Sequence, residues 1–245
     1  MKYPVKLFYR RVGQAMWDYR MISSGDHVAV GVSGGKDSLA LVYALAHFRD
    51  VSPQKFRISA ITVDSGWGQD FSKVKEFCQG LGIDYQVVPT LIGPVVFCLR
   101  KESNPCSLCA LLRRGALNNA AKSLGANKVA LAHHLDDAVE TLLMSMFYEG
   151  RMAAFAPVTY LTRTGLHVIR PMVYVPEHLT QQLARIIPLP VIPTLCPAAG
   201  RTARAAVKRA ISPLRSDKET DQTLKKAMVK FWRLQTSCSE EPSEE

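Results

Sequence analysis

The sequence predicts an α/β fold: a doubly wound, mainly parallel sheet with an N-terminal helix and a small basic helical region near the C-terminal end. Two observations support this prediction. Short β-branched apolar runs alternate with stretches of helical periodicity across residues 27–175, which is the rhythm of strands joined by crossover helices. A glycine-rich segment also directly follows the first apolar run, and open parallel sheets bind ligands at the carboxyl ends of their strands.

The first two elements are predicted from hydrophobic periodicity. Residues 7–22 place Phe8, Val12 and Ala15 on one helical face, so we expect a helix that packs as an extension over residues 1–26. Residues 27–32 are too β-branched and too short for a helix and are typical of a buried parallel strand.

The same reasoning predicts the remaining elements in order. They are helix 38–49, strand 57–63, helix 71–81, strand 84–89, a loop around Gly93 and Pro94, helix 105–124, strand 128–132, helix 136–148, strand 167–170, helix 177–187, an extended connector over 188–197, and helices 202–211 and 220–234. We therefore expect a central domain over 27–175, a C-terminal region over 176–236 and a tail over 237–245.

Composition narrows the class of protein. The chain has 245 residues, 47% of them hydrophobic and 21% charged, as is usual for soluble domains. No uninterrupted apolar run approaches the roughly 20 residues that span a bilayer. The N-terminal residues lack the apolar core of a signal peptide. These features predict a cytoplasmic protein with no membrane partner.

Positive charge is concentrated near the C-terminal end. The formal net charge is +10, and residues 201–233 hold ten Lys or Arg against three acids. Four of the last six residues are glutamates, which predicts an acidic, disordered tail. The basic region is compatible with a polyanion-binding face and equally with an ordinary solvated helix surface.

The segment Ser33-Gly34-Gly35-Lys36-Asp37-Ser38 lies between the first predicted strand and a helix. Its glycines let backbone amides approach a phosphate, and the helix N-terminus favours an anion. The spacing differs from the Walker A loop and matches the PP-loop signature S-G-G-x-D-S. Enzymes with that loop typically cleave ATP between the α and β phosphates. A strand-to-helix turn without a ligand is the weaker alternative. We therefore predict that residues 27–175 form a PP-loop nucleotide-binding domain.

Two further strand ends should lie at the same edge of the sheet. Asp64 follows the second strand, where PP-loop enzymes often hold adenosine, although an ordinary turn is also compatible. His133, Asp136 and Asp137 follow the fourth strand. The two carboxylates could cap a helix, but adjacent carboxylates beside phosphates also suit Mg²⁺. We favour the metal or catalytic interpretation.

Three of the six cysteines suggest a metal centre. Cys106 and Cys109 form a C-x-x-C pair at a predicted helix start, and Cys196 lies in a proline-rich segment. A structural zinc site needs four ligands, whereas three thiolates suit an iron–sulfur cluster with one open iron. Cys78 and Cys98 are predicted to be buried thiols.

Together these residues resemble the tRNA 2-thiocytidine synthetases of the PP-loop superfamily, with its adenine nucleotide alpha hydrolase-like fold. The resemblance covers about residues 5–212. Besides the PP-loop, it rests on segments 106–115, 133–150, 169–172 and 196–204. One departure is Ala199, at a position where some family members carry part of a second C-x-x-C pair.

The resemblance implies an enzyme that adenylates the C2 oxygen of a tRNA cytidine, expected at position 32, and then replaces that oxygen with sulfur. The implied cofactors are ATP, Mg²⁺ and a [4Fe–4S] cluster on Cys106, Cys109 and Cys196. The implied partners are tRNA and a sulfur donor, either a cysteine desulfurase or free sulfide, and a homodimer is compatible.

The expected site roles follow the motifs. Ser33, Gly34, Gly35, Asp37 and Ser38 would bind pyrophosphate and Mg²⁺, and Lys36 would stabilise phosphate charge. Asp136 would be catalytic or bind metal, with Asp137 beside it, and Asp64 and His133 would line the nucleotide site.

Two alternatives remain open. The enzyme could thiolate or otherwise modify a different tRNA base, as 2-thiouridine or lysidine synthetases do. The chain could instead be a non-catalytic, ATP-binding iron–sulfur sensor, although a sensor would not require the paired carboxylates.

Overall fold

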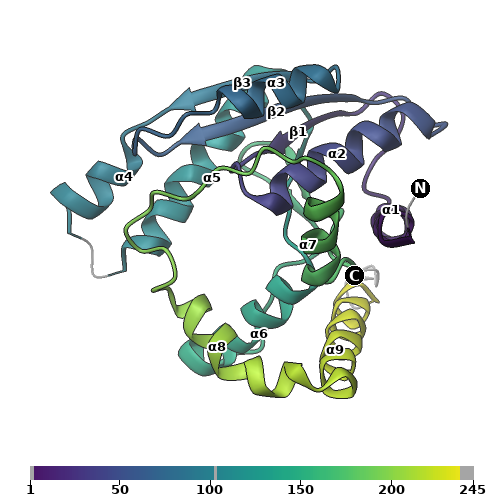
Figure 1. Cartoon of the computed structure of the whole chain (residues 1–245), viewed down its shortest axis with the longest axis vertical. Coiled ribbons are helices and arrows are strands. Elements are labelled where there is room, and N and C mark those ends of the chain that lie inside the picture. The colour runs from purple at the N-terminus through teal and green to yellow at the C-terminus, as the bar shows by residue number, and fades with distance from the viewer. Residues whose placement is uncertain (1–2, 102–103, 238–245) are drawn as a thin grey trace, which may run out of the picture.

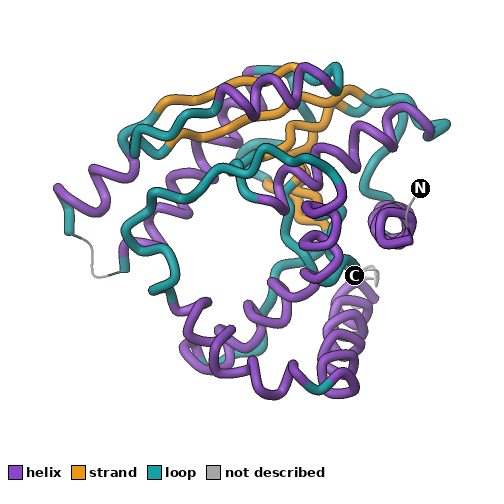
Figure 2. The backbone as a smooth tube through the Cα atoms, viewed as in Figure 1, coloured by secondary structure: helices purple, strands orange, loops and turns teal. Residues whose placement is uncertain are grey.

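The computed structural model describes residues 3–101 and 104–237 and contains a six-stranded sheet with helices on both faces (Figures 1 and 2). The strands are β1 (His27–Gly31), β2 (Arg57–Asp64), β3 (Asp84–Pro89), β4 (Lys128–Ala130), β5 (Val158–Leu161) and β6 (Leu166–Ile169). Their order is β3-β2-β1-β4-β6-β5, and all neighbours pair in parallel except β5 and β6. The predicted doubly wound, mainly parallel α/β fold is confirmed.

The helices alternate with the parallel strands as predicted. They are α1 (Tyr3–Asp18), α2 (Lys36–Val51), α3 (Ser72–Gly80), α4 (Ile92–Pro94), the π-helical turn η1 (Val95–Leu99), α5 (Pro105–Ser123), α6 (Leu135–Glu149), α7 (Glu177–Ile186), α8 (Ala203–Ser216) and α9 (Lys218–Ser237). None of the described helices combines the length and the apolar composition needed to cross a membrane.

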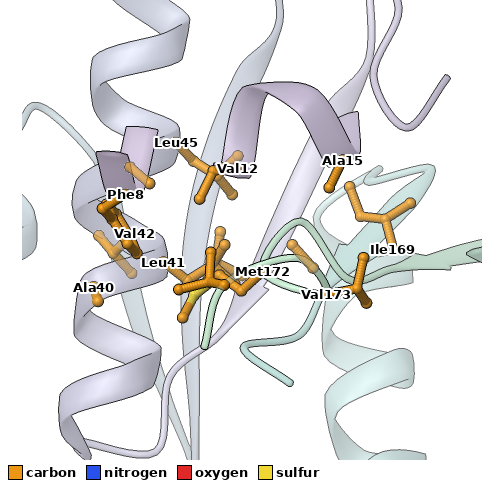
Figure 3. Packing of buried hydrophobic residues seen from close by; sticks show 14 of the residues in the cluster. Phe8, Val12, Ala15, Ala40, Leu41, Val42, Leu45, Ile169, Met172 and Val173 are labelled. Atoms are coloured by element: carbon orange, nitrogen blue, oxygen red, sulfur yellow. The ribbon is translucent and has the colours of Figure 1, made fainter. Parts of the chain in front are cut away.

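The central strands β1, β2 and β4 are mostly buried, which explains why they are rich in apolar residues, whereas the edge strands β3 and β5 are half-buried or exposed. In β1, Val28 and Val30 join the core formed with α1 and α2, whereas Ala29 faces the opposite core under α5. Figure 3 shows Phe8 of α1 beside Val42 of α2, and Val12 of α1 beside Leu45 of α2. The N-terminal helix therefore packs against the central layer through its predicted apolar face.

The strand order places a switch point between β1 and β4. The chain passes from β1 outward through β2 and β3, then returns to the other side of β1 as β4. The loops that follow β1 and β4 therefore lie side by side at the carboxyl edge, where doubly wound sheets bind ligands. This geometry brings the PP-loop next to the residues that follow β4.

The C-terminal helices share the main core. Trp232 of α9 is fully buried and donates from Nε1 to the Phe155 carbonyl, 2.8 Å away. Trp232 and Met228 belong to the same hydrophobic cluster as α1 and α2. The division at residues 26, 175 and 236 stays a prediction, and the predicted tail lies outside the described residues from 238 onward.

Sequence analysis missed one strand, and one local prediction was wrong. Residues 158–161 form the edge strand β5, paired with β6 through a turn over 162–165 in which Gly165 adopts φ +72°. The run is only four residues long, but two apolar runs flanking a glycine-containing turn are a hairpin signal.

The segment around Gly93 and Pro94, predicted to be a loop, is helical, since proline is tolerated in the first turn of a helix. Gly93 is needed for close packing, because a Cβ would lie 2.4 Å from the Trp67 ring.

Helix α8 also continues beyond its predicted end at residue 211 and contains Pro213. Proline removes one backbone donor and usually interrupts a helix. Here it lies in the last turns, where the carbonyl that loses its partner belongs to the exposed Arg209.

Candidate functional site

The PP-loop connects β1 to α2 and is organised by its own serines. Ser38 Oγ donates to the Gly35 carbonyl (2.9 Å) and accepts from the Ser33 amide (3.2 Å). Ser33 Oγ accepts from the Gly35 amide (3.3 Å). Gly34 has φ +80°, a conformation that favours glycine. The first amides of α2 have no intrahelical acceptor, so the loop presents donors suited to a phosphate.

The two charged residues of the loop are held by α7. Lys36 Nζ pairs with Asp37 Oδ2 (2.8 Å) and with Glu177 Oε1 (3.3 Å). Thr180 Oγ1 donates to Asp37 Oδ1 (2.6 Å). Burial tends to raise the pKa of Glu177, but the ammonium groups of Lys208 and Lys36 have the larger combined effect and lower it to about 2. Sequence analysis missed Glu177 and Thr180, since no local pattern signals contacts made more than a hundred residues away.

Asp64 ends β2 and shapes the turn that follows. Its Oδ1 accepts from the Gly66 amide (2.9 Å), and its carbonyl accepts from Thr90 Oγ1 (2.6 Å). Gly66 has φ +82°, and a Cβ there would lie 2.6 Å from the Thr90 carbonyl. Asp64 therefore has a clear turn-forming role, and its contact with adenosine stays a prediction.

Asp137 caps α6 and remains partly accessible. The His134 amide donates to Asp137 Oδ2 (2.9 Å), and the Asp137 amide donates to His134 Nδ1 (3.2 Å). This reciprocal arrangement is a capping box. The Asp137 side chain keeps 22% of its surface exposed, so its carboxylate combines the capping role with access to a ligand.

Asp136 is buried and joins four helices. Its Oδ2 accepts from the Glu177 amide at the start of α7 (2.7 Å). Its Oδ1 is paired with Arg215 of α8 and with Lys225 of α9 (3.2 Å). The residue is only 1% exposed. In this structure Asp136 ties the C-terminal helices to the carboxyl edge of the sheet, and its catalytic role stays a prediction.

We expect Asp136→Asn to destabilise the fold by about 3 kcal/mol, because two largely buried cations lose the more buried of the two carboxylates that they share. For a chain of this size that corresponds to a fall in Tm of roughly 6–12 °C. Thermal unfolding measures the change. Asp221→Asn is the matched control, since Asp221 contacts the same Arg215 and Lys225 but is more exposed. Equal, small effects of both variants would contradict the anchoring role.

The connector between α7 and α8 carries Cys196 past the PP-loop. The Ile192 amide donates to the Gly34 carbonyl (2.9 Å), and Gln69 Nε2 donates to the Pro193 carbonyl (2.9 Å). In Figure 1 this segment runs from α7 toward the start of α5 before it turns to α8. These contacts position the third cysteine near the C-x-x-C pair.

Cys106 and Cys109 lie in the first turns of α5, which begins with Pro105 after the capping residue Asn104. Burial raises the pKa of the Cys106 thiol, and Cys196 raises it further. Burial also raises the pKa of Cys109, with added contributions from Cys196 and Cys106 that oppose the effect of Arg113. The three predicted thiols are therefore near enough to one another for their charges to interact.

The role of the three thiols as ligands of an iron–sulfur cluster stays a prediction. Within the described ranges, no three His, Cys, Asp or Glu side chains are arranged to hold one metal ion. A four-iron cluster binds each thiolate through a different iron, so its ligands need not converge on one point. The prediction that Cys98 is buried was wrong: this residue is exposed on η1, whereas Val96 of the same turn is buried. Cys78 is buried as predicted.

Comparisons with known proteins show the family of this chain. A family model described as a PP-loop domain matches residues 6–188. A tRNA-cytidine(32) 2-sulfurtransferase from Syntrophotalea carbinolica is 41% identical over 210 residues, covering 84% of this chain and 81% of the relative. The chain belongs to the tRNA-cytidine(32) 2-sulfurtransferase family of PP-loop proteins. The resemblance inferred from the motifs is thus confirmed.

Other family members and solved structures extend the comparison. The tRNA-cytidine(32) 2-sulfurtransferase of Geotalea uraniireducens is 38% identical over 231 residues, which is 92% of this chain and 91% of that protein. The structure of the U34-tRNA thiolase NcsA from Methanococcus maripaludis, with its [4Fe-4S] cluster, superposes with a TM-score of 0.78. It is 24% identical and covers 94% of this chain and 80% of that chain, so it supports the fold.

In this family member, much of the C-terminal positive charge is used internally. Arg204 contacts Asp137 and Glu140, Lys208 Nζ pairs with Glu177 Oε2 (2.6 Å), and Arg215 and Lys225 pair with Asp136. The basic run between residues 201 and 233 therefore serves in part to neutralise acids at the carboxyl edge. Sequence alone could not separate this use from polyanion binding, because charge counts do not report pairing.

Proposed function

We propose that this chain is an ATP-dependent tRNA sulfurtransferase that adenylates the C2 oxygen of a cytidine, at position 32, and replaces it with sulfur. The observation that carries the proposal is that the PP-loop and the three thiols share one edge of the sheet, linked by the 187–202 connector. The names of the relatives supply the base and its position.

ATP is the first substrate in this proposal. The serines and glycines of the PP-loop would bind its phosphates, and Lys36 would exchange part of its pairing with Glu177 for the developing pyrophosphate. Asp37 and Asp137 are partly accessible carboxylates that could hold Mg²⁺ beside the phosphates. Asp64, His133 and Asp136 retain their proposed places in the nucleotide and catalytic site.

Adenylation makes the later substitution feasible. A carbonyl oxygen is a poor leaving group, whereas AMP is a good one, so cleavage of ATP drives the exchange. Cys106, Cys109 and Cys196 would hold a [4Fe–4S] cluster, which when bound supplies a site for the incoming sulfur. Holding the activated base beside that site replaces a bimolecular encounter with a positioned one.

The partners follow from the same reaction. They are tRNA and a sulfur donor, either free sulfide or a cysteine desulfurase. The protein is proposed to work in the cytoplasm, and a homodimer is compatible with this function.

The test uses anaerobically prepared protein with reconstituted iron and sulfide, ATP, Mg²⁺ and sulfide. The substrates are an unmodified tRNA transcript with cytidine at position 32 and a matched transcript with uridine there. Mass spectrometry of the digested nucleosides should find 2-thiocytidine in the first transcript and no thiolated base in the second. A thiolated uridine or a lysidine-type product would show that the enzyme modifies a different base and would overturn the proposed substrate. ATP binding without any modified nucleoside would favour a sensor.

A further inference from the structure

Arg170 is a recessed cation without an ion-pair partner in the described parts of the chain. It directly follows β6, and its Nη1 donates to the Ala156 carbonyl (2.6 Å) and to Thr159 Oγ1 (3.2 Å). Its guanidinium carbon lies 5.1 Å from the centroid of the Phe155 ring. Its Nε is buried and makes no hydrogen bond there. All of these contacts are with neutral groups, so no acid of residues 3–101 or 104–237 pairs with this charge.

Burying an unpaired charge costs free energy of folding unless an anion binds to it. Burial, followed by the charge of Arg114, lowers the pKa of Arg170 to about 10. The guanidinium therefore remains charged at neutral pH. Part of its surface stays accessible, so a ligand can reach it.

The neighbours of Arg170 favour an anion as well. Arg114 is exposed, and its Nε bonds to the Ala110 carbonyl of its own helix. The His133 ring lies 4.9 Å from Phe155, and its buried Nδ1 has no hydrogen-bond partner among the described residues. Burial and then Arg170 lower the pKa of His133 to about 4, so the ring is a neutral hydrogen-bonding group at pH 7.

Arg170 and His133 lie at the same edge of the sheet as the PP-loop. The PP-loop, His133 and Arg170 follow β1, β4 and β6, which are consecutive in the sheet. Arg114 belongs to the same helix as the C-x-x-C pair, one turn beyond Cys109. Three residues further on, Leu117 packs against Gly31, just before the PP-loop. A group bound by Arg170 would therefore lie at the carboxyl edge of the sheet, two strands from the pyrophosphate loop and near Arg114 of the helix that carries the C-x-x-C pair.

We infer that Arg170, assisted by Arg114, is a phosphate-binding site for the AMP portion of the nucleotide. This inference rests on the proposed function for its place in the reaction. When hydrosulfide attacks C2 of the adenylated base, a C–S bond forms and the C–O bond to the phosphate breaks. The oxygen and the bonding electron pair leave on AMP, and the proton is released to solvent. The phosphate thereby gains one negative charge, which the two guanidinium groups stabilise.

The test is calorimetric titration of the full-length protein with AMP and, separately, with pyrophosphate. Arg170→Gln is expected to weaken AMP binding about 10- to 100-fold, the range for a lost charge-assisted hydrogen bond. Pyrophosphate binding should change less than about threefold, because the PP-loop is untouched. Arg163→Gln is the matched control, since Arg163 lies exposed in the turn between β5 and β6 and should leave AMP binding unchanged.

A second variant guards against a purely structural effect. Arg170 also holds the Ala156 carbonyl, so thermal unfolding is measured for each variant. Arg114→Gln removes an exposed side chain and should keep the wild-type Tm, while weakening AMP binding several-fold. Unchanged AMP binding in Arg114→Gln together with a lowered Tm in Arg170→Gln would overturn the inference.

Two further outcomes separate the source of the phosphate and the proposed function. If Arg170 binds a tRNA phosphate, Arg170→Gln will reduce the salt dependence of tRNA binding by about one ion and leave AMP binding intact, which overturns the inference. If the wild type does not thiolate tRNA but its AMP affinity still depends on Arg170 and Arg114, the phosphate site stands and the proposed function fails.

Discussion

Replacement of Cys196 by alanine is expected to remove the iron–sulfur cluster and reduce tRNA thiolation to background. Wild-type protein prepared without oxygen should carry about four irons and four sulfides per chain. The variant retains only Cys106 and Cys109, and two thiolates on one helical turn leave half of a four-iron cluster without protein ligands. Iron and sulfide content and the absorbance spectrum measure the loss directly.

Cys98→Ala is the control for this experiment. Cys98 is an exposed thiol on η1, so its removal tests any general effect of losing a cysteine. It should keep the wild-type iron content. Full iron content in Cys196→Ala, or an equal loss in Cys98→Ala, would refute the three-thiol site and move the proposed function toward a base-modifying enzyme without a cluster.

Replacement of Lys36 by glutamine is expected to slow tRNA-dependent pyrophosphate release about 100-fold or more, which is the typical cost of removing one group that stabilises developing charge. The fold should tolerate the change, because the Lys36 side chain is 27% exposed and its pairs with Asp37 and Glu177 lie near the surface. Release of pyrophosphate from labelled ATP provides the measurement, with Tm recorded in parallel.

Lys208→Gln separates the loop from the ion pairs around it. Lys208 and Lys36 share the carboxylate of Glu177, so both variants disturb that pair, but only Lys36 belongs to the PP-loop. We expect Lys208→Gln to retain pyrophosphate release within about threefold of wild type, since its Nζ is assigned to Glu177 and not to phosphate. Equal losses in the two variants would assign the effect to Glu177.

The sequence itself determined the sheet and its ligand-binding edge. Short β-branched runs such as 28–32 cannot form stable helices of their own, and the alternation with helical periods leaves few topologies. The hexapeptide 33–38 then required a strand end and a helix start on either side, so its place at the carboxyl edge followed from local chemistry alone. Family membership was readable for the same reason, because its motifs are continuous segments.

The tertiary structure alone decided how the charged side chains are paired. The pairing of Asp136 with Arg215 and Lys225, and of Lys36 with Glu177, joins residues that are far apart in the chain. The lack of an acidic partner for Arg170 among the described residues is likewise a property of its surroundings, because the residues next to it in sequence do not reveal which side chains the fold brings near it. Local propensity depends on adjacent residues, whereas ion pairing and burial depend on which distant surfaces the fold brings into contact.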